Sequence, residues 1–589
     1  MLVSPMRRVN ELVSADIGNY QTNKKNWDLF YNAKEEGLKG NGVTDDYTAL
    51  STLINHKIDG EEATIIFAPG TYVIGTSITI PSNINLYLTK GAKLSPNSGD
   101  TITINGSIEA GLWQIFAGAG TIAGSMDVEE VYPQWFGAKG DGVTNDTTAI
   151  QAAATCISNG GTLYLPSGTY MGEGITLNPK TKVIGAGGAV LKGVTGISDI
   201  LNLNSNCLVD GIEIDGNKSN KTGGKGITVS GKTNVTIRNC YIHDTFSQAI
   251  SISNTTKYKV INNTIENAGG VGATSYQGVD LYFSNNGVVE GNQISNCLHG
   301  VQFWGGDSAT LSTTGIFDIS ISNNIVKSVK GGIWGSLGER IVVQGNTVET
   351  TTDVGIDFEG CKNSSAVSNS VKDCTNGCYS VFYGCDGITF SDNTALQTGS
   401  NTRAFWATTS KTNKNIIVTG SSFQVTSGLV MQTDSNSLQE SRITNNRLIS
   451  GSSSAMRILD GTKIDIVNNR MDVVGGYGIR FEGPSDSRIV NNTITTSSDG
   501  TTGGAQGGIY MFRRSTTYPC QRNDVNGNKM YGFVTSINDD CFGDVTSNNW
   551  IRHNRVSTIY RRSGAGYAGK IESNVSTVNP NTTITETTF

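Results

Sequence analysis

The chain has 589 residues, a formal net charge of −6 at pH 7 and no run of basic residues, which argues against nucleic acid as a partner. It contains 73 Gly but only 10 Pro, a composition that suits tight turns between strands, because Pro would remove strand hydrogen-bond donors. A neutral or anionic glycan is compatible with this charge, since local Arg clusters can act within an acidic surface.

The N-terminal sequence MLVSPMRRVNELVSADIGNY contains no apolar stretch of signal-peptide length, and no segment approaches the roughly 18 apolar residues of a membrane span. We therefore expect no cleaved signal peptide and no membrane insertion. The Cys and His residues show no metal-ligand spacing, because no CxxC pair occurs and no His cluster accompanies Cys374 and Cys378. The sequence thus predicts no metal site and no cofactor.

A repeated motif occurs twice near the N-terminus. GNGVTDDYTAL begins at Gly40 and GDGVTNDTTAI at Gly140, and strand-like segments containing GTY follow each copy. Between each motif and its GTY segment, apolar residues recur at helical spacing. Asp45 or Asp46 in the first copy and Asp146 in the second are suited to cap the N-terminus of that helix. We predict that each short helix covers the open end of a β-structure, which would otherwise expose an unpaired strand edge.

The second copy, VYPQWFGAKGDGVTNDTTAIQAA with GGTLYLPSGTY, resembles the N-terminal motif of the pectate-lyase-like right-handed parallel β-helix superfamily. VDGIEIDGN, from Val209 to Asn217, is similar to an early coil of that superfamily, which includes phage tailspikes and polysaccharide depolymerases. The resemblance covers roughly residues 30–575. It implies a β-helix that acts on extracellular glycans, but no particular reaction, because lyases, hydrolases, epimerases and non-catalytic adhesins share the fold.

From Asn263 onwards an Asn recurs just before an apolar residue at nearly constant spacing. The steps between Asn324 and Asn346, and between Asn446 and Asn469, are 22 and 23 residues. Such a period, made of short β-branched strands, is the signature of a solenoid. A buried Asn in each coil is expected to hydrogen-bond to the Asn above and below, as in other stacked β-structures. The recurring positions are Asn263, Asn292, Asn324, Asn346, Asn369, Asn393, Asn446, Asn469, Asn492, Asn528, Asn554 and Asn574, with Ser421 in the Asn place between Asn393 and Asn446.

The predicted fold is therefore all-β: a right-handed single-stranded parallel β-helix with a short N-terminal capping helix and a small N-terminal β-domain. We divide the chain into an N-terminal segment, the small β-domain, the main β-helix and a C-terminal segment. Their boundaries are 1–24, 25–128, 129–566 and 567–589. The small domain repeats the capping motif, so we expect it to attach the main body to another structure.

Alignment of the coils on the recurring Asn yields a strand of alternating apolar and variable residues, as in GVDLYF, GVQFWG and GIDFEG. Side chains alternate across a strand, so the variable positions face outward and stack from coil to coil. The first outward column is predicted to hold Asp280, Gln302, Trp334, Asp357, Phe382, Trp406, Met431, Arg457, Arg480 and Tyr510. The second is predicted to hold Tyr282, Trp304, Ser336, Glu359, Gly384, Thr408, Thr433, Leu459, Glu482 and Phe512. Aromatic rings, acids and Arg indicate a contact surface for a glycan, or alternatively a subunit interface.

Asp357 and Glu359 are the predicted catalytic residues. They stand at i and i+2 of one strand, so their Cβ atoms lie about 6.8 Å apart, and inverting glycosidases hold their two carboxyls roughly 6.5–9.5 Å apart. Trp334 and Phe382 on adjacent coils are expected to raise the pKa of one carboxyl, as a general acid requires. The alternative is that the two acids bind sugar hydroxyls only, or form a salt bridge with Arg340. The predicted glycan-binding residues are Asp280, Tyr282, Gln302, Trp304, Trp334, Glu339 in a loop after Trp334, Trp406, Arg457, Arg480, Glu482 and Tyr510.

The leading hypothesis is a phage tailspike-type depolymerase that hydrolyses a bacterial surface polysaccharide internally. A lyase acting by β-elimination is the first alternative, but a lyase needs a base beside a cationic group, and the sequence indicates no tight cluster of Lys, Arg, His or Tyr on adjacent coils. A non-catalytic adhesin or structural fibre is the second. The resemblance to tailspikes further implies a homotrimer in the phage virion, acting outside the cell.

Overall fold

The computed structural model describes residues 29–576 and 587–588, except 158, 310–314, 401, 409–410, 497–504, 515–519, 534, 542–548, 557, 562–569 and 573. The predicted N-terminal segment, 1–24, and most of the predicted C-terminal segment lie outside the described residues. The chain forms two compact units. The first comprises 1–194 and 201–213, and the second comprises 195–200 and 214–589.

The first unit begins with three small parallel sheets. Their buried residues alternate along each strand, as in Ile65, Phe67, Leu86 and Leu88, so one face of each strand forms the interior. The strands are β1 (Phe30–Asn32), β3 (Ala63–Phe67), β6 (Ile84–Leu88) and β9 (Ile108–Glu109) in one sheet, β2 (Asn41–Asp45), β4 (Gly70–Ile74) and β7 (Ala92–Pro96) in the next, and β5 (Ile78–Ile80), β8 (Thr101–Ile104) and β10 (Thr121–Ala123) in the third.

The second copy of the N-terminal motif opens longer sheets. Its helix α4 (Thr147–Cys156) buries Ile150 and Ala153, as the helical spacing predicts. Parallel strands follow: β11 (Asp141–Asn145), β13 (Gly168–Met171) and β16 (Ala189–Lys192) in one sheet, β12 (Gly161–Leu165), β15 (Thr181–Gly185) and β18 (Leu208–Asp210) in the next, and β14 (Ile175–Thr176) and β17 (Leu201–Leu203) in the third.

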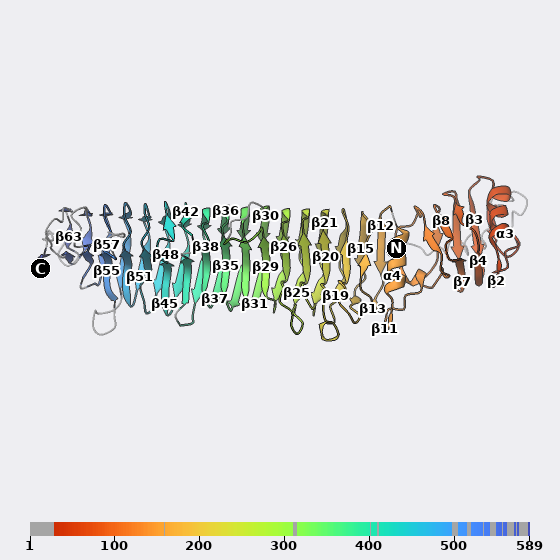
Figure 1. Ribbon diagram of the computed structural model, residues 1–589, viewed down its shortest axis with the longest axis horizontal. Coiled ribbons are helices and arrows are strands. Elements are labelled where there is room, and N and C mark those ends of the chain that lie inside the picture. The colour runs from red at the N-terminus through yellow and green to blue at the C-terminus, as the bar shows by residue number, and fades with distance from the viewer. Residues whose placement is uncertain are drawn as a thin grey trace, which may run out of the picture. The chain divides into compact units, whose positions relative to one another are not determined.

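The first copy has the shorter helix α3 (Tyr47–Thr52), which continues as a π-helix, Leu53–Ile58 (Figure 1).

The helix-capping prediction is wrong for Asp46 and Asp146, which precede the two helices and make no side-chain cap bond, whereas Asp45 does bind the first amide of its helix. Asp45 Oδ1 accepts from the Tyr47 amide at 3.0 Å, at the start of α3. Asp146 instead accepts from the amides of Lys139 and Gly140 at 2.8 and 2.9 Å and so closes the loop that precedes α4. The capping bond of α4 comes from Asn145, whose side chain accepts from the Thr147 amide. The Asp146 carboxylate therefore stabilises a turn, because it binds the amides of the preceding loop in place of those of the helix.

The second unit is a right-handed parallel β-helix whose strands follow one another as successive coils from β20 to β64 (Figure 1). Within this unit, two of the three sheets run from β21 (Thr233–Arg238) to β62 (Lys570–Glu572) and from β22 (Tyr241–His243) to β63 (Val575–Ser576). The third, here called the site sheet, consists of β20 (Ile227–Ser230), β23 (Ile250–Ser253), β26 (Val279–Tyr282), β29 (His299–Trp304), β32 (Gly331–Ser336), β35 (Val354–Glu359), β38 (Gly377–Phe382), β41 (Thr402–Ala407), β45 (Gly428–Thr433), β49 (Met456–Leu459), β52 (Gly476–Glu482), β55 (Ala505–Phe512), β58 (Ile537–Asp540), β61 (Ile559–Arg561) and β64 (Thr587–Thr588).

The Asn ladder is confirmed. Asn369 accepts at Oδ1 from the amide and the side chain of Asn346, at 2.9 and 3.0 Å. Its own Nδ2 donates to Asn393 Oδ1 at 3.0 Å and to the Val343 carbonyl at 2.9 Å. Ser421 continues the ladder through its hydroxyl, which accepts from the Asn393 amide. All ladder positions are buried, so each coil satisfies polar groups of its neighbour that water does not reach.

Among the described residues, the one before each ladder Asn has a left-handed backbone. Asn323 has φ 55° and Gly345 has φ 66°, a region that Gly and Asn tolerate best. This explains the recurring Asn-Asn and Gly-Asn pairs of the sequence. A second, less regular ladder of Ser and Asn lies in another turn of the coils, where Ser364, Ser441 and Ser487 accept backbone amides of the preceding coil. The sequence analysis missed it because Ser is common in any loop.

Replacement of Asn369 or Asn469 by Leu is expected to lower the free energy of unfolding. Each change leaves buried amide groups of the neighbouring coils unpaired, at about 1–3 kcal/mol each. Thermal unfolding followed by circular dichroism measures the effect, and Asn526→Leu, at a half-buried strand position, is the matched control. Melting temperatures equal to that of the control in both variants would contradict a stabilising ladder.

Candidate functional site

The outward face of the site sheet carries the predicted columns. Coil-to-coil pairing places Asp280, Gln302, Trp334 and Asp357 in one register. The column continues through Ser380, Trp406, Gln432, Arg457, Arg480 and Tyr510. The second column holds Tyr282, Trp304, Ser336, Glu359 and Phe382, and further on Leu459, Glu482 and Phe512. Most of the predicted binding residues therefore share one face.

Two coils depart from the predicted columns. Ser380, not Phe382, occupies the first column of β38, so Phe382 takes the second in place of Gly384. In β45, Gln432 occupies the first column, whereas Met431 pairs with the buried Phe405 and faces the interior, and Thr433 pairs with the buried Ala407. In β38 and β45 the Gly, Gly377 or Gly428, stands three or four residues before the first column instead of two as in β29 and β35, and apolar alternation alone does not fix the register.

Asp357 and Glu359 form a coupled pair of carboxyl groups in β35. Asp357 is only 4% exposed, and its Oδ1 accepts from the Ser380 hydroxyl at 2.8 Å. Burial, together with the nearby Glu359 charge, raises the pKa of Asp357 well above its usual value. Burial also raises the pKa of Glu359, although hydrogen bonds from Ser308 and Trp334 oppose that rise. Both shifts favour the protonated form, so the pair holds a proton to higher pH than two isolated carboxyl groups would.

Aromatic rings border this pair on the coils before it. Trp334 Nε1 donates to Glu359 Oε1 at 3.1 Å, and the Ser308 hydroxyl donates to Glu359 Oε2 at 2.9 Å. The Trp334 ring also contacts the rings of Trp304 and His299, with centroids 5.5 and 5.0 Å away. Glu359 is thus held in one orientation beside a surface of two indoles, which suits stacking of a sugar ring.

A second acidic centre lies around Asp280. Gln248 and Gln302 donate to its two carboxylate oxygens at 3.3 and 3.2 Å. Burial raises the pKa of Asp280 to about 6, and the positive charge of Lys225 opposes the rise. His299 Nδ1 lies 2.8 Å from Gln302 Oε1, so Nδ1 carries the hydrogen, because an amide oxygen only accepts. Burial lowers the pKa of His299.

One cation and one His lie on opposite sides of Asp280, on different coils. Lys225 Nζ donates to Ser251 at 3.0 Å, and Ser251 pairs with Asp280 across the coils. The sequence analysis missed Lys225 and Gln248 because both precede the regular Asn repeat. Without that repeat, the sequence offers no residue on which these coils can be aligned.

The C-terminal part of the face is rich in Arg. Arg403 lies over the Trp406 ring at 4.4 Å, and Trp406 Nε1 donates to Asp434 at 3.1 Å. Arg457 and Arg480 both bind Glu482, with their nearest contacts at 3.1 and 2.5 Å. Glu482 is therefore occupied by two guanidinium groups.

Of three further residues predicted to bind the glycan, two lie on the site sheet and one does not. Tyr510 lies in the first column, and its hydroxyl is 3.5 Å from Asp540 Oδ2. Tyr282 is 42% exposed, with its ring 4.5 Å from that of Phe283. Glu339 does not lie in a loop of the site sheet, since it belongs to β33 (Gly338–Gln344) of another sheet and pairs with Arg340 at 2.8 Å. Arg340 in turn binds Asp318 and Glu339, so it is engaged away from Asp357 and Glu359.

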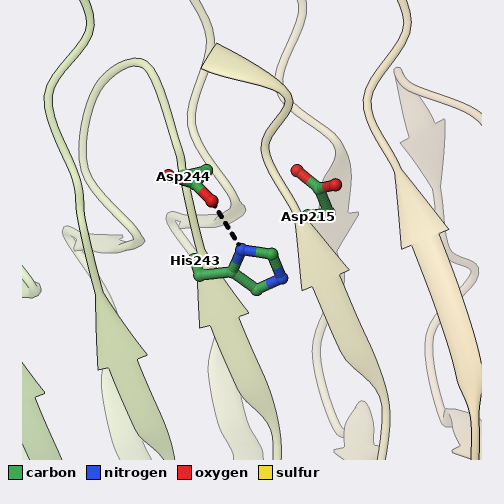
Figure 2. Close-up of side chains that lie close together, drawn as sticks. All are labelled: Asp215, His243 and Asp244. Atoms are coloured by element: carbon green, nitrogen blue, oxygen red, sulfur yellow. Dashed lines mark hydrogen bonds and ion pairs between the residues drawn. The ribbon is translucent and has the colours of Figure 1, made fainter. Parts of the chain in front are cut away.

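One group of side chains has ligand types suited to a metal ion. Asp215 at the end of β19 (Glu213–Asp215), together with His243 and Asp244, presents ligand atoms within 4.8 Å of one another (Figure 2). His243 Nδ1 lies 2.9 Å from Asp244 Oδ2, and the His243 ring stacks on Tyr241. The Lys218 ammonium already lies 3.4 Å from Asp244, so a cation would have to displace it. The sequence analysis did not foresee this group because its members come from coils that the Asn repeat does not align.

A family model described as the right handed beta helix region matches residues 195–287, 273–423 and 427–588. The chain belongs to this β-helix family. A second model, rhamnogalacturonase A/epimerase, pectate lyase-like, matches residues 30–93 of the β-helix protein. The described part of the β-helix protein contains no helix long and apolar enough to cross a membrane.

Individual relatives resemble parts of the β-helix protein. Mannuronan C5-epimerase AlgE5 of Azotobacter vinelandii is 27% identical over 255 residues, which is 38% of this chain and 24% of that protein. The preneck appendage protein of Bacillus phage PZA is 36% identical over 127 residues, 18% of this chain and 14% of that protein. The chain thus spans about a quarter or less of the length of these curated relatives. Among solved structures, the Dettilon tailspike protein aligns over 69% of each chain with 16% identity and a TM-score of 0.32.

The pKa of Asp280 predicts a pH dependence of stability. Its carboxyl binds a proton more tightly in the folded chain, with a pKa of about 6, than in the unfolded chain, near 3.8. The folded state therefore loses stability as pH rises through this interval. Asp280→Asn removes that loss. The free energy of unfolding of the variant minus that of the parent, measured by thermal unfolding, should therefore be about 2–3 kcal/mol larger at pH 7 than at pH 4.

Asp318→Asn is the control for this measurement. Arg340 lowers the pKa of Asp318 through a hydrogen bond, so the parent gains stability from this group as pH rises, and the difference between variant and parent should move in the opposite direction. A stability difference for Asp280→Asn that does not change with pH would refute the raised pKa.

Proposed function

We propose that this protein is a tailspike-type depolymerase that cleaves a bacterial surface polysaccharide by endo-glycosidic hydrolysis. The observation that carries the proposal is the Asp357 and Glu359 pair, two carboxyl groups with raised pKa beside Trp334 on an outward face rich in aromatic residues. The mannuronan C5-epimerase among the relatives supports action on a polysaccharide. The phage preneck appendage protein supports a place on a virion.

In this proposal Asp357 is the general acid and Glu359 the general base. Asp357 is more deeply buried and lies beside a second negative charge, and both raise its pKa, so it is the member of the pair that serves as the proton donor. Ser380 binds Oδ1, which leaves Oδ2 to protonate the glycosidic oxygen. Glu359, held by Trp334 and Ser308, activates the attacking water. The i, i+2 spacing of about 6.8 Å between Cβ atoms supports a single displacement with room for that water.

Asp357→Asn and Glu359→Gln are each expected to lower turnover by about 10²-fold or more, the usual scale for loss of an acid or base. Polysaccharide binding should persist, because the amides keep the shape and the indoles remain. Release of reducing ends from capsule or lipopolysaccharide of candidate hosts measures turnover. Glu339→Gln is the control, since Glu339 lies on another sheet. Turnover within a few-fold of the parent in both carboxyl variants would exclude this pair.

A lyase is the second candidate, favoured by the juxtaposition of Lys225, Asp280 and His299. A cation beside a buried acid and a His with its pKa lowered by burial could neutralise a uronate and remove a proton. The products distinguish the two reactions, because β-elimination leaves a 4,5-unsaturated uronate that absorbs in the ultraviolet. Unsaturated products that vanish in Asp280→Asn but persist in Asp357→Asn would replace the hydrolase proposal.

We further propose that the protein acts as a homotrimer in a phage virion, attached through the region preceding the main β-helix. The aromatic residues on one face and the match to a phage appendage protein support this assignment. Light scattering should give about three times the 62.4 kDa mass of one chain. A mass of one chain at micromolar concentration would refute the trimer while leaving the catalytic proposal unaffected.

A further inference from the structure

Two Arg side chains share one carboxylate in the C-terminal part of the site sheet. Arg457 and Arg480 lie in register on adjacent coils and both bind Glu482. The Glu482 side chain is 3% exposed, whereas those of Arg457 and Arg480 are 32% and 35% exposed. The single carboxylate is therefore covered by two guanidinium groups, and one positive charge faces outward without a counter-charge in this triad.

The two guanidinium groups have donors left over. Glu482 accepts from Arg457 Nε and Nη2 and pairs with Arg480 Nη2, but two guanidinium groups carry ten N–H donors. Among the described residues, Arg480 Nε is buried without a hydrogen-bond partner. An unpaired buried donor costs free energy, and an anion bound at the outer edge of Arg480 would let the guanidinium reorient and pair this group.

Aromatic rings lie directly beside these cations. Tyr510 is in register with Arg480, and its ring stacks on Tyr477 and on Phe512, with centroids 5.0 and 5.3 Å away. Two neighbouring acids have partners of their own, since Asp460 Oδ2 binds Arg514 at 2.6 Å and Asp540 lies 3.5 Å from the Tyr510 hydroxyl, whereas Asp460 Oδ1 is buried without a hydrogen-bond partner among the described residues. A cationic pair next to aromatic rings suits a charged sugar, whose ring stacks while its anionic group meets the guanidinium fork.

We propose that Arg457 and Arg480 form a subsite for a sugar carboxylate, so that the polysaccharide is acidic; this inference rests on the proposed function. The two Arg residues lie four and five coils from Asp357, which is about 19 and 24 Å along the axis at about 4.8 Å per coil. The charged sugar is thus bound several units away from the cleaved bond. The subsite holds the chain in register, and the carboxyl pair at Asp357 and Glu359 acts elsewhere on it.

The experiment uses the full chain with Asp357→Asn, so that binding is measured without cleavage. The probes are purified bacterial capsular and O-antigen polysaccharides, acidic and neutral, together with carboxyl-reduced forms of those that bind. Arg480→Gln is the test variant, because Arg457 still pairs with Glu482, and Arg480→Lys keeps the charge but loses the fork. Arg470→Gln, 65% exposed in β51 (Arg470–Val473) of another sheet, is the control. Melting temperatures verify that each variant is folded.

We expect acidic polysaccharides to bind, and their affinity to fall at least tenfold on carboxyl reduction. The affinity should also fall at least tenfold in Arg480→Gln and by less in Arg480→Lys. It should not change in Arg470→Gln. A neutral or carboxyl-reduced polysaccharide that binds equally well, or a folded Arg480→Gln that binds within twofold, would overturn the subsite and leave the depolymerase proposal standing. A panel in which no polysaccharide is bound by Asp357→Asn or cleaved by the parent would contradict both.

Discussion

The interaction on which the structure depends is the hydrogen bonding from one Asn to the next along the β-helix. Ladder residues such as Asn346 and Asn369 accept the amide and the side chain of the Asn in the preceding coil and donate to the Asn in the next. Because these groups are buried, a coil that slipped by one residue would leave several of them unpaired. From Asn263 onwards the ladder therefore fixes where the coils turn, and with it how the strands of the site sheet stack.

The alignment of the strands explains how acids on the outward face become buried by the side chains of adjacent coils. Strands in register place side chains about 4.8 Å apart from coil to coil, so a large residue covers a small neighbour. Asp357 is only 4% exposed although it points away from the core, because it lies between Trp334 and Ser380 in its column. The raised pKa of Asp357 and of Asp280 follows from this lateral packing, without any charge being placed in the apolar interior.

The same stacking separates charge along the face. Asp280, Asp357 and Glu359 lie on the coils toward the N-terminal end of the site sheet, whereas Arg457 and Arg480 lie on later coils, around a single carboxylate. A polymer lying along the sheet would meet protonatable acids at one position and fixed cations at another. Such a division lets one surface combine proton transfer with recognition, because the charges that bind the chain lie too far away to suppress the raised pKa values.

The sequence by itself determined the solenoid, because a repeat in the low twenties with a buried polar residue has few other solutions, and it placed Asp357, Glu359 and most of the aromatic residues on one face. It failed where the repeat lost its markers: Met431 is in the core, Ser380 takes the place predicted for Phe382, and Glu339 is on another sheet. Only the tertiary structure decided the partners of these side chains. Contacts such as Lys225 with Ser251, or Arg457 with Glu482, depend on which coils stack and how far each side chain reaches, and neither is encoded in the spacing of a single strand.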